Sequence, residues 1–359
     1  MPLDKKKISQ LIESSARVFN DCALENGAIV AANTDKTYYP RQAANYRYVW
    51  PRDASFVCVA AKHLNIEIQE KFLDWLFTKP EDFKKDKLLY ANYSTNGRVA
   101  SMGAQFEPDQ MGTVLWMVYS NFKTDLKKAL KYKDLIKWLA EGLCAAWNKK
   151  YFLPNTLDLW EDGYRKTSSV MENNFTYSLA ACARGLLCAH QILPNKAWEA
   201  VARQMIREIE EAYSLSDEYF YRNAGKISDK NIDASLLGLV YPFEIIEPDD
   251  KKIKNTVQKI EENLVVGGGV HRFQFDYFDS EGTAWEGGGA WPILNFWLAI
   301  YWVLAGNKKK ALAYYTWVLD RVENYIPEQI FPDFRKSINP LAWSHAMFVI
   351  ASRYLGIIK

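Results

Sequence analysis

Residues 171–190, MENNFTYSLAACARGLLCAH, decide the fold class of this chain. The segment is apolar on nearly every side of a 3.6-residue helix and is rich in small residues, which is typical of a helix buried on most sides. Further segments with this pattern lie at about 53–64, 110–120, 233–240, 290–305 and 340–355. The sequence therefore predicts six buried helices that begin about 50 to 60 residues apart.

A second set of predicted helices is charged and amphipathic, with Lys and Glu between regularly spaced apolar residues. Its members lie at about 5–20, 67–78, 125–146, 196–213, 250–264 and 308–324. The two sets alternate strictly along the chain, which is the signature of stacked helical hairpins. We predict an all-α (α/α)6 toroid of six helical hairpins, with the apolar helices inside. The alternative is an open solenoid, which needs polar capping repeats at its ends.

The composition argues against several classes of protein. A net charge of +2 gives no electrostatic reason to expect nucleic acid or an anionic membrane as a partner. The N-terminal sequence MPLDKKKISQ lacks the apolar core of a signal peptide, and no apolar stretch approaches the length of a membrane span. The five cysteines are odd in number and lie mostly in apolar helical runs, which favours free thiols. We predict a cytoplasmic protein without a metal site.

The long connections of the chain all precede buried helices. They span residues 33–52, 79–109, 147–170, 214–232, 265–289 and 325–339. In a closed toroid these six loops gather at one end, over the N-termini of the inner helices. We therefore expect a binding pocket there.

The third connection carries the first candidate catalytic residue. It contains Asp158-Leu159-Trp160-Glu161-Asp162, just before a buried helix. Trp160 would desolvate Glu161 and Asp162 would add a like charge, and both effects raise the pKa of a carboxyl group. A raised pKa suits a general acid. The alternative role of these acids is to cap the helix.

The sixth connection carries a second carboxyl group, Glu328, in an otherwise apolar stretch. Splitting a glycosidic bond requires one carboxyl group that protonates the leaving oxygen and another that activates water. Glu161 and Glu328 can fill these two roles from the same end of the toroid, with Gln329 holding the water or the carboxylate. A solvated loop acid is the alternative for Glu328, and Glu286 is its main rival as the base.

The first connection ends in Trp50-Pro51-Arg52-Asp53, an arginine–aspartate pair at the start of a buried helix. Arg52 and Asp53 can bind neighbouring sugar hydroxyls, while Trp50 offers a flat surface to a sugar ring. The alternative is an ion pair that caps the helix, since Asp is a favoured N-cap residue.

These loops, in this order, resemble glycoside hydrolase family 15, the glucoamylase and glucodextranase family, from about residue 40 to 356. Residues 50–53 are similar to the family's Trp-x-Arg-Asp, which implies that Arg52 and Asp53 hold the terminal glucose. Residues 158–161 resemble the segment with the general acid, so the resemblance gives that role to Glu161. Glu328 and Gln329 resemble the Glu-Gln that bears the general base.

Two further segments add to the resemblance. Residues 270–273, Val-His-Arg-Phe, are similar to the family's Arg-Tyr segment with Phe in place of Tyr. Residues 340–346 resemble the helix start that follows the base, with Trp343 near the pocket. The predicted substrate-binding residues are Trp50, Arg52, Asp53, Trp160, Asp162, Arg272, Gln329 and Trp343.

The resemblance implies an inverting hydrolase that releases β-glucose from the non-reducing end of an α-glucoside and needs no cofactor. The β-sandwich that precedes the toroid in prokaryotic relatives is absent from this sequence, as is any starch-binding module. We therefore expect residues 1–359 to form a single catalytic (α/α)6 domain acting on short α-gluco-oligosaccharides. One alternative is a trehalase. The other is a non-catalytic regulatory sugar-binding toroid, as in the phosphorylase kinase subunits that resemble this family.

Overall fold

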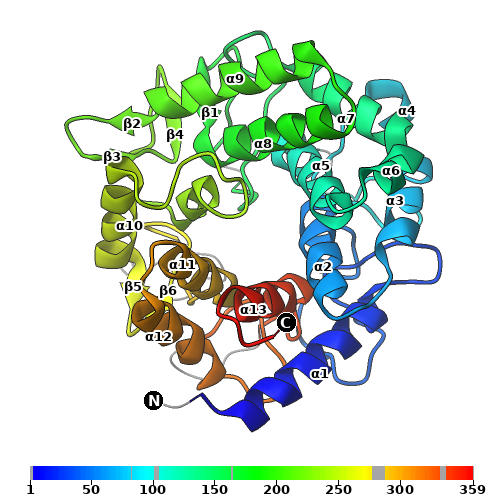
Figure 1. Cartoon of the computed structure of the whole chain (residues 1–359), viewed down its shortest axis with the longest axis vertical. Coiled ribbons are helices and arrows are strands. Elements are labelled where there is room, and N and C mark those ends of the chain that lie inside the picture. The colour runs from blue at the N-terminus through cyan, green and yellow to red at the C-terminus, as the bar shows by residue number, and fades with distance from the viewer. Residues whose placement is uncertain are drawn as a thin grey trace.

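The computed structural model is a ring of helices in two concentric layers (Figure 1). It describes residues 3–81, 83–100, 105–162, 165–276, 288–331 and 337–358. The inner layer consists of α2 (Pro51–His63), α5 (Pro108–Phe122), α8 (Thr176–Ile192), the 3-10 helix η2 (Ala234–Leu239), α11 (Pro292–Leu304) and α13 (Ala342–Tyr354). Each inner element packs against the next, and α13 packs against α2, which closes the ring.

The outer layer is built from the charged segments. It consists of α1 (Lys5–Cys22), α3 (Gln69–Thr78), α7 (Lys133–Ala146), α9 (Lys196–Glu211), α10 (Lys251–Leu264) and α12 (Lys308–Leu319). Three short elements, α4 (Phe83–Asp86), α6 (Leu126–Ala129) and η1 (Leu130–Tyr132), complete it. The predicted (α/α)6 toroid is confirmed.

The two layers begin their helices with different residues. Three inner helices start with a proline, at Pro51, Pro108 and Pro292. Proline is favoured at the first helical position because its missing N–H would have no partner there. Four outer helices, α1, α9, α10 and α12, instead start with polar caps, such as Asn195, which accepts from the backbone N–H of Ala197 at 2.9 Å. These local signals fix where the helices begin.

Helices α5 and α8 approach each other through two glycines. A Cβ atom added to Gly112 would lie 2.3 Å from the carbonyl oxygen of Ala181. One added to Gly185 would lie 2.5 Å from the carbonyl oxygen of Gly112. Real Cβ atoms do not approach backbone oxygens this closely, so only glycine permits this helix contact.

The fourth inner element differs from the prediction. Residues 233–240 were expected to form a buried α-helix, and the structure has instead the six-residue 3-10 helix η2. Pro242 lacks a backbone N–H and disfavours helical geometry in the residue before it, so the helix cannot extend. The short element still fills its place in the ring by packing against α8 and α11.

The remaining differences concern the ends of elements. Helix α8 begins at Thr176 rather than at residue 171, and α12 ends at Leu319 rather than at residue 324. The strands described are short and form three antiparallel pairs. These are β1 (Asn173–Phe175) with β4 (Asn223–Gly225), β2 (Tyr213–Ser214) with β3 (Tyr219–Phe220), and β5 (Val265–Val266) with β6 (Gly269–Val270).

Two expectations from composition can be compared with the structure. All five cysteines lie in the described ranges, and each has a free thiol. None of the helices in the described ranges combines the length and the apolar character needed to cross a membrane.

Candidate active site

The ten predicted site residues all lie in the described part of the chain. Seven are buried, and three are half-buried: Trp50, Glu161 and Asp162. Solvent therefore reaches the site on the side of these three residues. Glu286, the rival for the base, lies outside the described residues.

Glu161 is held by two residues from the first connection. The indole N–H of Trp50 donates a hydrogen bond to Oε1 of Glu161. The same oxygen lies 3.8 Å from Nη2 of Arg52. The backbone of Glu161 adopts a φ of 55°, a left-handed conformation that is uncommon for residues other than glycine. Such conformations persist where surrounding contacts hold them, and they cluster at active sites.

The environment of Glu161 raises the pKa of its carboxyl group to about 7. Burial is the largest cause, and the charges of Asp53 and Asp109 add to it. The Arg52 charge and the Trp50 hydrogen bond act in the opposite direction. The sequence analysis predicted a raised pKa but assigned it to Trp160 and Asp162. The neighbours that shift the pKa of Glu161 in the folded structure are instead Arg52, Trp50, Asp53 and Asp109.

Arg52 is the centre of a buried ionic cluster. Its Nη1 lies 3.1 Å from Oε2 of Glu107 and 2.9 Å from Oδ2 of Asp109. Its Nε lies 3.3 Å from Oδ1 of Asp53. Together with Glu161, four carboxyl groups share this one guanidinium, so their simultaneous ionisation would leave excess negative charge. Burial raises the pKa of Asp53 to about 6, and it also raises the pKa values of Glu107 and Asp109.

Helix α2 carries Arg52 and Asp53 of this cluster in its first turn. The helix begins at Pro51 with Trp50 as its N-cap residue, so Asp53 lies within the first turn and does not cap the helix. The guanidinium carbon of Arg52 lies 5.5 Å from the ring centroid of Trp343 in α13. The cluster therefore connects the first and last inner helices.

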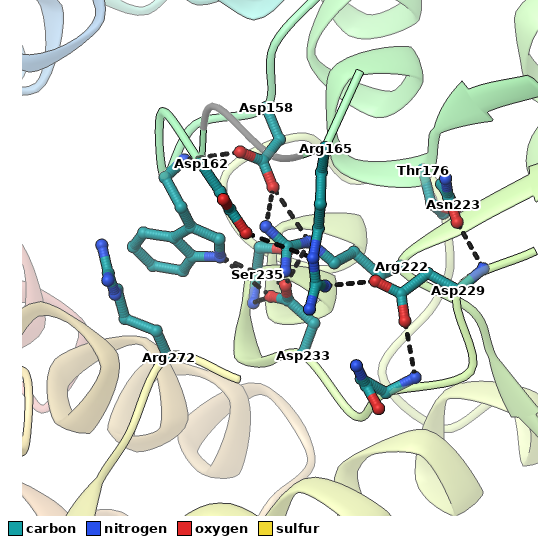
Figure 2. A network of polar contacts seen from close by, with 12 residues as sticks. Asp158, Asp162, Arg165, Thr176, Arg222, Asn223, Asp229, Asp233, Ser235 and Arg272 are labelled. Carbon is teal, nitrogen blue, oxygen red and sulfur yellow. Dashed lines mark hydrogen bonds and ion pairs between the residues drawn. The ribbon is translucent and has the colours of Figure 1, made fainter. Parts of the chain in front are cut away.

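A second ionic network supports the loop that carries Glu161 (Figure 2). Nε of the buried Arg222 lies 2.9 Å from Oδ2 of Asp158 and 3.0 Å from Oδ2 of Asp233. Asp158 accepts from the backbone N–H of Trp160 at 3.2 Å, and its carbonyl oxygen accepts from the N–H of Glu161 at 3.0 Å. Arg222 thus fixes the turn that presents Glu161.

The indole of Trp160 also belongs to this network. Its N–H donates to the carboxylate of Asp233, at 3.1 and 3.2 Å from the two oxygens. The guanidinium carbon of Arg272 lies 5.5 Å from the Trp160 ring and 4.8 Å from the ring of Trp291. Arg272 also forms a two-bond ion pair with Asp276, at 2.6 and 2.7 Å. Trp160 and Arg272 are therefore neighbours, as the sequence analysis expects of residues in one pocket.

Asp162 lies next to Glu161 but forms a separate ion pair. Nε of Arg165 lies 3.1 Å from Oδ2 of Asp162, and Nη1 of Arg165 bonds to Asp229 (Figure 2). Asp162 is thus tied to the fourth connection.

Glu328 and Gln329 lie on the loop before α13. Glu328 is only 5% exposed, and its backbone N–H donates to the carbonyl oxygen of Ile338 at 2.8 Å. The backbone N–H of Gly289 donates to Oε1 of Gln329 at 3.2 Å. Burial, followed by the charge of Glu328, raises the pKa of Tyr39. Glu328 is therefore a buried carboxyl group and not a solvated loop acid.

The sequence analysis missed residues that the fold brings to the site. Arg222, Asp233 and Glu107 were not among the predicted site residues, and Arg222 and Asp233 lie in no local motif. Arg222 lies 64 positions from Asp158, a separation that the packing of neighbouring connections bridges. Within the described residues, no cluster of His, Cys, Asp or Glu is suited to hold a metal ion.

The family model described as glycosyl hydrolases family 15 matches residues 21–324. The chain is 29% identical, over 91% of its length, to an uncharacterized glycosyl hydrolase of Methanocaldococcus jannaschii, and it spans 52% of that protein. It is 26% identical to the isomaltose glucohydrolase of Kribbella flavida, with 89% of this chain and 87% of that protein covered. Trehalase 1 of Sulfolobus acidocaldarius is 23% identical, over 77% of this chain and 49% of that protein.

Solved structures share the fold. A glycosidase, one variant of which was solved in complex with glucose, has a TM-score of 0.81 with 23% identity over all of both chains. A bacterial glucoamylase complexed with acarbose has a TM-score of 0.73 with 20% identity, over 96% of this chain and 55% of that one. The fold and the family match define a glycoside hydrolase. The chain belongs to glycosyl hydrolase family 15.

The hydrogen bond from Trp50 leads to a prediction about pH. Replacing Trp50 by Phe keeps a ring but removes the N–H that stabilises the ionised form of Glu161, so the pKa of Glu161 should rise further above about 7. A general acid must be protonated, so activity is lost as the pH rises through its pKa. We expect the alkaline limb of kcat/KM against pH to move to higher pH in Trp50→Phe.

Trp302→Phe provides a matched control. The indole N–H of Trp302 donates to Oε1 of Glu261 at 3.0 Å, and Glu261 lies on the outer helix α10. This variant also removes an indole–glutamate hydrogen bond, but away from the site, so its pH profile should match that of the unaltered protein. An unmoved alkaline limb in Trp50→Phe would show that Glu161 does not control it.

Proposed function

We propose that this chain is an inverting, exo-acting α-glucoside hydrolase that releases β-glucose from the non-reducing end of short α-gluco-oligosaccharides. Glu161 is the general acid and Glu328 is the general base of the proposed reaction. The two groups would act from opposite sides of the sugar, as inversion requires. The whole of residues 1–359 would serve as a single toroidal catalytic domain.

The observation that carries this proposal is the state of Glu161. A carboxyl group with a pKa of about 7 is about half protonated at neutral pH and largely protonated below it, so it can donate a proton to a leaving glycosidic oxygen. Glu161 is also the partly open member of the acidic cluster, with a side chain 30% exposed, whereas the side chain of Glu107 is fully buried. It is thus the member of the cluster that is most open to a substrate.

The neighbours of Glu161 would bind the terminal glucose. Arg52 and Asp53 lie at the start of α2, beside Glu161. Their polar groups would bind the hydroxyls of the terminal glucose. Trp50 is half-buried and offers its ring to the open side. Buried further from solvent, Trp160, Arg272 and Trp343 would form the wall around that glucose.

On the other side of the site, Glu328 would take the proton from the attacking water. Gln329, whose Oε1 accepts from the backbone N–H of Gly289, would keep this loop in place. Asp162, paired with Arg165, would border the leaving group because it adjoins the acid.

Among substrates, we propose isomalto-oligosaccharides first. The isomaltose glucohydrolase is matched over 87% of its length, and Trehalase 1 and Trehalase 2 over only 49% and 43%. Trehalase activity is the second candidate because these two relatives match the same chain.

The test is release of glucose from a panel of isomaltose, maltose, kojibiose and trehalose at equal concentration. We expect isomaltose to give the highest kcat/KM. Turnover of trehalose alone would replace the proposal by a trehalase. Binding of these sugars without turnover of any of them would favour a regulatory toroid and contradict the proposed hydrolase.

A further inference from the structure

A groove of about 790 Å³ lies apart from Glu161, on the outer part of the same end of the toroid. It lies between the last turn of α9, strand β2 and the β1–β4 pair, which adjoin one another in Figure 1. Helix α9 follows α8 after a short turn and packs against it, so the end of α9 lies beside the start of α8. The volume of the groove is in the range of sites that bind small ligands.

The side chains that line this groove suit a neutral ligand rich in hydroxyl groups. Its three cations are matched by three carboxylates, so the groove attracts neither anions nor cations strongly. Three tyrosines, Tyr151, Tyr213 and Tyr221, also line it. Tyrosine combines a flat apolar ring with a polar group, the combination that a sugar ring with its hydroxyls matches.

Asn174 supplies an unused hydrogen-bond acceptor in the groove. Its residue is 3% exposed, and its Nδ2 donates to the carbonyl oxygen of Lys150 at 2.9 Å. Its Oδ1 is buried and has no hydrogen-bond partner in the protein. Buried polar atoms are nearly always paired, so an orphaned oxygen at a groove points to a donor from outside the protein. A sugar hydroxyl is such a donor.

The groove is formed by fixed structure. Asn174 and Ala224 face each other across the β1–β4 pair. Oγ1 of Thr176 donates to the carbonyl oxygen of Tyr221 at 2.6 Å, and the hydroxyl of Tyr221 bonds to Asp217. A site that is already ordered loses less entropy when a ligand binds.

We propose that this groove is a second carbohydrate site, which binds a stretch of α-glucan outside the catalytic pocket. The proposal rests on the proposed function, because the ligand is a longer chain of the same α-linked glucose units as the substrate assigned there. The groove and the pocket are built on the same two connections, since β4 directly follows Arg222, the residue that bonds to Asp158. A longer glucan held in the groove would raise the local concentration of chain ends at the pocket.

The experiment is electrophoresis of the full chain in native gels that contain dextran or glycogen, which slow a protein that binds them. We expect the unaltered protein to be slowed in at least one polymer. Tyr151→Ala should weaken that binding by about tenfold, the factor that a single important interface residue contributes. Ala224→Leu, which fills part of the groove without removing a contact, should weaken it as well. Tyr119→Ala is the matched control. Tyr119 lies in the last turn of α5, outside the groove, so this variant should bind like the unaltered protein.

The variants also separate this proposal from the proposed function. Tyr151→Ala and Ala224→Leu should keep kcat/KM on isomaltose within about twofold, because neither residue belongs to the catalytic site. Equal slowing of both variants and the unaltered protein, or no slowing of the unaltered protein in either polymer, would overturn the second site. Failure of the unaltered protein to hydrolyse any disaccharide would instead contradict the proposed function. Circular dichroism would confirm that each variant is folded. The gel comparison would then still test the second site, even if no disaccharide is hydrolysed.

Discussion

Glu161→Gln is expected to lose almost all hydrolysis of natural α-glucosides. General acid catalysis typically contributes about 10² to 10⁴ in rate, and an amide cannot donate a proton to the leaving oxygen. The amide oxygen can still accept the Trp50 hydrogen bond, so the loop should keep its shape. The measurement is kcat on isomaltose, with Glu323→Gln, an exposed glutamate, as the control that should remain active.

An α-glucosyl fluoride separates loss of the acid from loss of the site. Fluoride leaves with far less help from a proton, so Glu161→Gln should hydrolyse this substrate much better than isomaltose, and without the alkaline limb near pH 7. Proton NMR in the first minutes should show β-glucose, because water attacks the face opposite the leaving group. Equal loss on both substrates would mean that Glu161 does not act as a proton donor. Initial α-glucose would mean a retaining mechanism.

Glu328→Gln is expected to have the second large effect, with a different pattern. The amide of this variant cannot take a proton from water, so the rates of hydrolysis of both isomaltose and the fluoride should fall by a factor of about 10² to 10⁴. Glucose binding, measured by calorimetry, should be largely intact because the amide has the same shape. If Glu328→Gln were near normal and Glu286→Gln inactive, the base would be Glu286.

The sequence alone predicted the fold class, which is confirmed, and it supplied the two candidate glutamates, whose roles stay predictions. Helical periodicity is a local property, so residues 171–190 already contain the evidence that a helix is buried. Prolines and polar caps act on the first turn of their own helix, and Pro51 fixes the start of α2 in this way. The prediction of an α-helix was wrong at residues 233–240. There a local signal that the periodicity does not include, Pro242, confines the inner element to a short 3-10 helix.

The environment of the candidate acid was decided by tertiary structure alone. The indole that bonds to Glu161 is Trp50, 111 positions away, and Trp160 instead bonds to Asp233. No periodicity or motif reports such pairs, because they exist only when the helical hairpins pack side by side and bring loops that are distant in sequence into contact. A pKa depends on burial and on charges within a few ångströms, whatever their separation in sequence. The sequence therefore determined which residues carry carboxyl groups in the connections, and the tertiary structure decided which of these groups have raised pKa values.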